Sequence, residues 1–140
     1  MKILLAVDGS KYTKKMLAYL STHDDLFGTS HRYTAFTAQP PLPPLVRSAV
    51  GREIVNSYYA DETKKVLAPV CKFMLRHGID ANSSWKVGLA GEAISKFAMA
   101  GKFDLLVMGS RGHGAWSSLV MGSVVNQVLA NCRVPVLLIR

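Results

Sequence analysis

Five stretches of the sequence are rich in apolar residues and have the length of single strands. The first and fourth stretches are nearly continuous apolar runs, which is typical of strands buried on both faces of a parallel sheet. Pro135 cannot donate a ladder hydrogen bond, so the last strand is expected at a sheet edge or an interface. The strands are predicted at residues 3–7, 33–38, 83–87, 103–108 and 134–139.

Helical periodicity fills the segments between these strands. Ser10 can cap a first helix, because its hydroxyl can accept a hydrogen bond from a free backbone N–H group. The inner face of this helix would carry Met16, Leu17 and Leu20. Three further helices are predicted at residues 52–77, 92–100 and 123–131.

Prolines and one glycine set limits on these elements. Pro69 lies inside the long second helix and is expected to kink or break it, because proline removes one backbone hydrogen bond. Gly78 is expected to end that helix. Residues 40–44 include four prolines, which predicts a stiff loop that forms a rigid rim beside a pocket.

Strands that alternate with helices indicate a three-layer α/β/α fold, in which a parallel sheet carries helices on both faces. In such Rossmann-like open sheets, ligands bind beyond the carboxyl ends of the strands, where the strand order reverses. Two loops meet this condition. The first is Asp8-Gly9-Ser10 after the first strand, and the second begins at Gly109 after the fourth.

The composition bounds the class of protein. A length of 140 residues favours a single domain over residues 1–140, and a hydrophobic content of 49% is sufficient for a core. No stretch has the length and hydropathy to cross a bilayer, and the apolar N-terminal run is too short for a signal peptide, so a cytoplasmic protein is expected. Cys71 and Cys132 are expected as buried free thiols, and their spacing does not favour a metal site.

The net charge of +8 suits an anionic partner. Positive residues are scattered, however, with small clusters at Lys11, Lys14 and Lys15 and at Lys64 and Lys65. Aromatic residues do not interleave with these clusters as they do in RNA-binding sheets. The clusters are therefore interpreted as solvated faces, and nucleic acid is not favoured as a partner.

The residues best suited to binding a polyphosphate lie between Gly109 and Val124. Glycines let a backbone approach a polyphosphate closely and allow positive φ angles. The start of the last helix at Gly122-Ser123 adds free N–H groups and the positive end of a helix dipole. Arg111 and His113 can add positive charge, although Arg111 can equally be a surface residue. The stretch contains no acidic residue, which suits an anionic ligand.

Two common nucleotide motifs are excluded. The P-loop string GxxxxGK[ST] does not occur in the chain. The dinucleotide fingerprint is missing after the first strand, and Ala38 and Gln39 stand where an NAD site requires an acidic residue. Ser117 replaces the third glycine of the pattern that Gly112-His113-Gly114 begins. NAD is therefore disfavoured.

The spacing that does fit is Gly-x2-Gly-x9-Gly-Ser, formed by Gly109, Gly112, Gly122 and Ser123. This spacing resembles the ATP-binding signature of the universal stress protein family, the UspA-like domain. The resemblance covers essentially the whole chain, including the opening strand with Asp8-Gly9-Ser10 and the closing strand at residues 134–139. It implies a five-stranded parallel sheet in the order 3-2-1-4-5 and ATP, with Mg²⁺ held through its phosphates, rather than a dinucleotide.

The resemblance also implies roles for individual residues. Asp8 would hydrogen-bond in the adenosine part of the pocket, and the backbone near Ala38 would meet adenine. Met108 and Gly109 would line the base and ribose. The phosphates would be held by Gly112, Gly122, Ser123 and Val124. The family commonly pairs its last strands across a two-fold axis, so a homodimer through Val136 to Ile139 is expected.

The expected function is an ATP-binding regulatory module that acts as a nucleotide-dependent switch in a stress response, with little or slow hydrolysis. The residues favour binding over catalysis, because Asp8 is the only acid near the motif and hydrolysis needs positioned metal ligands and a group that orients water. Two alternatives stay open. One is a slow ATPase, and the other is a dimeric interaction module that binds no nucleotide.

Overall fold

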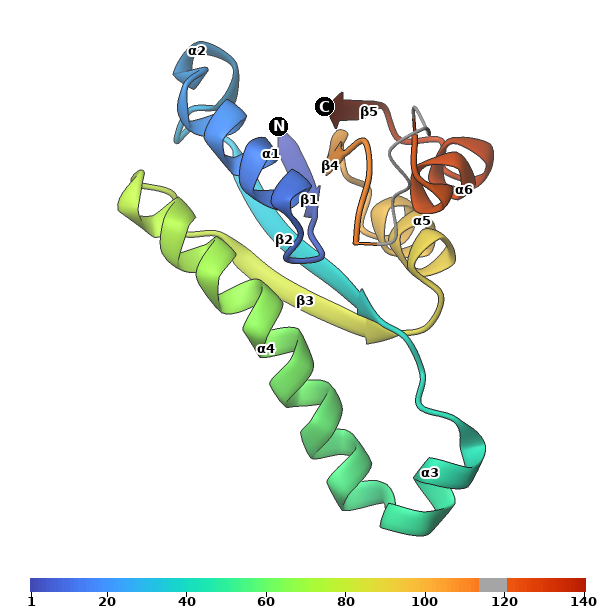
Figure 1. The fold of residues 1–140 in the computed structure, drawn as a ribbon. Helices are drawn as coiled ribbons and strands as arrows, with labels where there is room; N and C mark the ends of the chain where they lie inside the picture. Colours follow the sequence, from blue (N-terminus) through green and yellow to red (C-terminus); the bar gives the residue numbers. More distant parts are fainter. Residues whose placement is uncertain (114–120) are drawn as a thin grey trace.

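The computed structural model describes residues 1–113 and 121–140, and these residues form an open sheet with helices on both faces (Figure 1). All neighbouring strands are parallel, and the strand order is β3-β2-β1-β4-β5, so the predicted fold class and strand order are confirmed. The strands are β1 (Lys2–Ala6), β2 (Arg32–Gln39), β3 (Asn82–Val87), β4 (Leu105–Gly109) and β5 (Val136–Ile139).

The position of β1 at the centre of the sheet explains why its sequence is a continuous apolar run. Ile3, Leu4 and Leu5 are fully buried, because helices cover both faces of the sheet at this strand. Ile3 and Leu5 pack in the hydrophobic cluster on one face, and Leu4 packs in the cluster on the other. The strand order reverses between β1 and β4, where Ala6 pairs with Met108.

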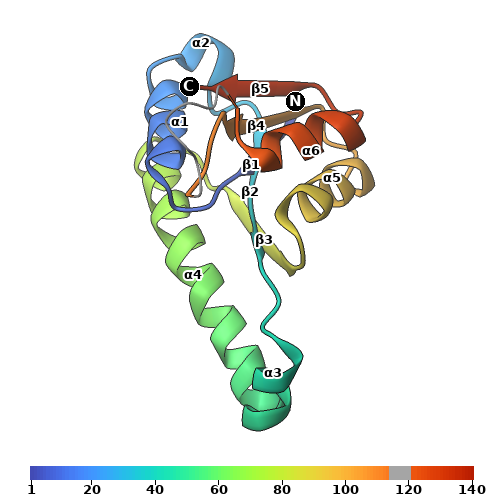
Figure 2. The same ribbon diagram turned by 45° about the vertical axis from the view of Figure 1, so that its right-hand side comes forward.

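Two long helices cover each face (Figures 1 and 2). One face carries α1 (Lys11–Ser21) and α4 (Arg52–Arg76), and the other carries α5 (Ala90–Ala100) and α6 (Ser123–Asn131). Two short helices, α2 (Asp24–Phe27) and α3 (Pro44–Val50), lie in the connections. Among the described residues no helix is long and apolar enough to cross a membrane.

The predicted start of α1 is confirmed. Ser10 adopts extended backbone angles, and its side chain accepts a hydrogen bond from the Tyr12 N–H group. Met16, Leu17 and Leu20 are buried against the sheet, as their spacing predicts. The cap matters for the site, because it fixes the point at which the chain leaves β1 and turns into the helix.

Pro69 does not break α4, contrary to the expectation from sequence. The helix continues over 25 residues through the proline. One lost hydrogen bond is outweighed here by the packing of Leu67, Val70 and Met74, which are buried on both sides of Pro69. The N-terminal part of α4 extends past the sheet together with α3 (Figure 2).

Two smaller expectations are also wrong. The 40–44 segment is not wholly a loop, because Pro44 begins α3, where its missing N–H group is no loss at a helix start. None of these prolines lines the cavity described below, so they do not form its rim. Cys71 and Cys132 are free but only half-buried, whereas the sequence predicted buried thiols.

Candidate functional site

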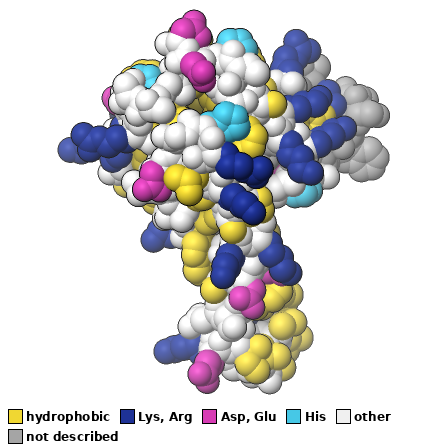
Figure 3. Space-filling view, turned by 90° about the vertical axis from the view of Figure 1, so that its left-hand side faces the viewer, with side chains coloured by type: hydrophobic (Ala, Val, Ile, Leu, Met, Phe, Trp, Pro, Cys, Tyr) yellow, Lys and Arg dark blue, Asp and Glu magenta, His cyan; other side chains and the backbone are white. Residues whose placement is uncertain are grey.

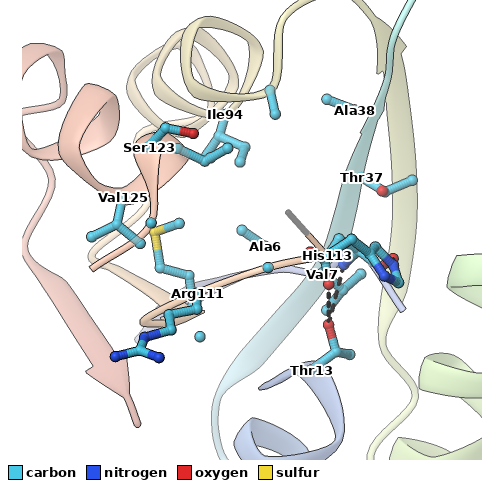
Figure 4. A pocket seen from close by; sticks show the side chains of 17 residues that line it. Ala6, Val7, Thr13, Thr37, Ala38, Ile94, Arg111, His113, Ser123 and Val125 are labelled. Atoms are coloured by element: carbon cyan, nitrogen blue, oxygen red, sulfur yellow. Dashed lines mark hydrogen bonds between the residues drawn. The ribbon is translucent and has the colours of Figure 1, made fainter. Parts of the chain in front are cut away.

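A cavity of about 350 Å³ lies at the carboxyl edge of the sheet, where β1 and β4 end side by side. Its size is within the range of small-molecule and cofactor sites. The loops after β1 and β4, the end of β2, and the first turns of α5 and α6 surround it (Figure 4). This is the position at which open α/β sheets place their ligands.

The structure brings all nine predicted site residues to this cavity. They come from four separate segments of the chain, and the fold places them around one space. The residues are Asp8, Ala38, Met108, Gly109, Arg111, Gly112, Gly122, Ser123 and Val124. Their roles toward a ligand remain predictions.

Asp8 braces the turn between β1 and α1. Its carboxylate oxygen Oδ1 accepts hydrogen bonds from the Ser10 N–H group at 2.9 Å and from the Thr13 hydroxyl at 3.0 Å. The Asp8 N–H group donates in turn to the Thr13 Oγ1 atom at 3.1 Å. One carboxylate oxygen is therefore committed to the turn, while the residue as a whole lines the cavity.

A hydrogen bond between distant segments joins the two loops at the mouth of the cavity. His113 Nε2 lies 2.7 Å from the backbone oxygen of Asp8. A carbonyl oxygen can only accept, so Nε2 carries the proton and donates it. Nearby, a Cβ atom placed on Gly112 would lie 2.5 Å from Asp8 Oδ2, so the glycine permits the loop to pass directly over the carboxylate.

Gly109 and Gly112 are required because neighbouring atoms leave no room for a side chain, and not because the backbone has a positive φ angle. Gly109 is needed because an added Cβ would lie 2.7 Å from the Tyr12 Cβ atom of α1. Gly122 has φ −77° and ψ 163°, which any residue can adopt. The expectation of positive φ in this loop is therefore wrong for its described glycines. Positive φ occurs instead at Gly9, Gly51, Gly78 and Gly88.

The N-terminus of α6 opens onto the cavity without a side-chain cap. The N–H group of Gly122 is already used, because it donates to the Ser110 backbone oxygen at 2.9 Å. The geometry of a helix start leaves the N–H groups of Ser123, Val124 and Val125 without acceptors inside the helix, and all three residues line the cavity. Three donors at the positive end of a helix dipole suit an anion.

The cavity has an apolar part and a polar part. Figure 4 shows Ala38 of β2 at one side of the space and Ser123, at the start of α6, at the other, with Ile94 of α5 beside Ser123. The Arg111 side chain points away from Thr37 and Ala38. An apolar ring system and a charged tail can therefore be held at different ends of the same cavity.

Sequence reasoning missed several lining residues. Thr13 and Thr37 are buried polar residues at the cavity, and Ile94 contributes apolar surface from α5. Thr37 could have been found, because it lies at the carboxyl end of a predicted strand. Ile94 gave no such signal, since its helical spacing is that of any core residue.

A built metal site is not seen in the part of the chain that the structure describes, where no group of three or more His, Cys, Asp or Glu residues lies together. Asp8 is the one acidic residue that lines the cavity among the described residues.

The open parallel sheet, with helices on both faces and a cavity at its switch point, places this chain in the class of Rossmann-like α/β proteins. The model of the universal stress protein family matches residues 1–140, and the chain belongs to this family. A relative from Thermus aquaticus, described as "Universal stress protein in QAH/OAS sulfhydrylase 3'region", is 33% identical over 144 residues, which cover 99% of this chain and 97% of the relative.

Solved structures of the family share the fold. UspA from Lactobacillus plantarum matches with a TM-score of 0.80 at 17% identity and covers 100% of this chain and 97% of its own. The Archaeoglobus fulgidus universal stress protein in complex with dAMP matches with a TM-score of 0.67 at 19% identity, covering 100% and 98%. An Arabidopsis thaliana family protein with AMP bound matches with a TM-score of 0.68 at 13% identity, covering 99% and 90%.

Proposed function

We propose that this protein binds an adenine nucleotide, ATP in particular, in the cavity at the carboxyl edge of the sheet. The observation that carries the proposal is that all nine residues expected from the loop sequence and from the family resemblance line one cavity of about 350 Å³. Family members with AMP and dAMP bound support the adenine class of ligand.

The proposed arrangement follows the two parts of the cavity. The backbone near Ala38 of β2 would meet the base, and Met108 and Gly109 of β4 would line the base and the ribose. The N–H groups at the start of α6, with the Ser123 hydroxyl, would hold the phosphates. Mg²⁺ would be held mainly through the phosphates, since Asp8 is the one acid among the described residues that line the cavity and its Oδ1 is bonded within the turn.

Binding with little hydrolysis fits these residues better than catalysis. A hydrolytic site needs a group that accepts a proton from water or orients it. His113 Nε2 and Asp8 Oδ1 hold the two loops in place, and Asp8 is the one acid that lines the cavity among the described residues, so the cavity presents fewer groups than the metal ligands and water-orienting residue of a hydrolytic site. We therefore propose a regulatory module in which the nucleotide stabilises one arrangement of the two joined loops.

The test is nucleotide binding by the purified protein. Mass spectrometry of the denatured sample should release an adenine nucleotide, and ATP with Mg²⁺ should raise the melting temperature of stripped protein. Ligand at about 100 times its Kd stabilises by about 2.7 kcal/mol, which corresponds to roughly 8 °C for a chain of this size. Absence of both signals would favour a nucleotide-free interaction module, and steady ATP turnover would favour the ATPase.

We also propose a homodimer through β5. This strand lies at the edge of the sheet, and Val136, Leu137 and Leu138 are only partly buried. A second copy could continue the sheet by pairing with the free edge. Sedimentation equilibrium should then give a mass twice the 15.3 kDa of the chain, whereas a monomer at micromolar concentration would contradict the proposal.

A further inference from the structure

Three exposed lysines form a positive surface at the start of α1. Lys11, Lys14 and Lys15, which we call the lysine patch, lie in the first turns of the helix. Figure 3 shows Lys and Arg side chains gathered over α1 and along the neighbouring helix α4. The lysine patch lies outside the cavity, because none of its residues lines that space.

The position of these lysines is unfavourable for the helix itself. The N-terminus of a helix is the positive end of its dipole, where cations destabilise and acids stabilise. The first turn of α1 contains no acidic residue, and the whole helix carries none. Lys11 also stands three and four residues before Lys14 and Lys15, which places like charges on adjacent turns.

Nothing within the described part of the chain neutralises the lysine patch. The ion pairs there join Lys65 to Glu62 and Lys96 to Glu92, and neither involves α1. The ammonium groups of Lys11 and Lys15 instead lie over the same Tyr12 ring, 5.4 and 5.3 Å from its centre. Two like charges that share one ring repel each other, so an external anion would stabilise the arrangement.

We propose that the lysine patch docks an acidic segment of a partner protein. Lys11 and Lys15 are one helical turn apart, which matches the spacing of carboxylates at positions i and i+4 of an acidic helix. Tyr12 is half-buried and covered by two ammonium groups, so it is not free to stack on a base. These features favour an acidic protein over a nucleic acid.

The surface is connected to the loops of the cavity. Tyr12, whose ring lies under the ammonium groups of Lys11 and Lys15, packs closely against Gly109, and α1 begins three residues after Asp8. A partner on the lysine patch would therefore touch the element that fixes one wall of the cavity. The docking surface itself goes beyond the proposed nucleotide function and is tested without nucleotide.

The experiment measures binding of a fluorescein-labelled oligoglutamate peptide by fluorescence anisotropy at low and physiological salt. The variant Lys11→Gln, Lys14→Gln, Lys15→Gln should weaken binding about tenfold, since three exposed charge contacts contribute roughly 0.5 kcal/mol each. The matched control is Lys86→Gln, Lys102→Gln, Arg133→Gln, which removes the same charge from exposed positions outside α1 and α4. It should weaken binding less than about twofold.

Three outcomes would overturn the proposal. Equal losses in both variants would show that only net charge matters, and tighter binding of a labelled oligouridylate than of the peptide would assign the surface to RNA. A lower unfolding midpoint in the lysine-patch variant than in the control would assign the lysines a structural role. An unchanged or higher midpoint is expected, because the variant removes cations from the positive end of the α1 dipole.

Discussion

Gly122→Val is expected to lower nucleotide affinity by at least about 100-fold while the protein stays folded. The backbone at this position is extended, with φ −77° and ψ 163°, so valine meets no conformational barrier. Its Cβ would lie 3.4 Å from the Arg111 Cα atom, which is ordinary contact. The two further methyl groups would fill the space between the loop at 110–112 and the start of α6, where we place the phosphates.

Isothermal titration calorimetry with ATP and with AMP checks this expectation. Gly122→Ala should reduce affinity less than valine, because it adds only the first carbon of the side chain. Ala49→Val on the exposed helix α3 serves as the control and should bind like the wild type. Unchanged affinity of the valine variant would remove Gly122 and the start of α6 from the proposed phosphate site.

Gly109→Val is expected to damage the fold rather than only the site. A Cβ at this position would lie 2.7 Å from the Tyr12 Cβ atom and 3.2 Å from the Arg111 backbone oxygen. Neither neighbour can move without shifting α1 or the loop after β4. Forcing extra carbons into such a contact is expected to reduce the free energy of unfolding by about 3 kcal/mol.

Urea denaturation followed by circular dichroism measures this loss, with Gly122→Val as the internal comparison. The same substitution at two glycines of one motif should thus have different consequences. Valine at Gly109 should lower the stability of the fold, whereas valine at Gly122 should lower nucleotide affinity. A free energy of unfolding within about 0.5 kcal/mol of the wild type for Gly109→Val would contradict the packing argument.

Much of the fold could be predicted because local sequence patterns determine where its strands and helices begin and which faces are buried. The apolar run at Ile3 to Leu5 marks a strand buried on both faces, and it is fully buried in the structure. Ser10 marks a helix start, and its side chain accepts the predicted capping hydrogen bond. The last helix begins at Ser123, where the glycine and serine residues predict it.

Predictions failed where packing between distant segments outweighed local preference. Pro69 disfavours a helix locally, yet α4 continues through it because buried neighbours hold both sides. The loop glycines suggest positive φ angles, yet Gly109 and Gly112 are required by the closeness of Tyr12 and Asp8. Neither neighbour is visible in the sequence around the glycines.

The sequence by itself determined the order of strands and helices along the chain, the buried central strand and the glycine-rich loop that leads into the last helix. These properties depend on hydrogen bonds and side-chain spacing within a few residues, so a linear pattern encodes them. Only the tertiary structure decided the contact of His113 with the Asp8 backbone, which spans 105 positions, and the contribution of Thr37 and Ile94 to the cavity. Such contacts depend on how separate elements pack, and packing is not specified by the spacing within any one of them.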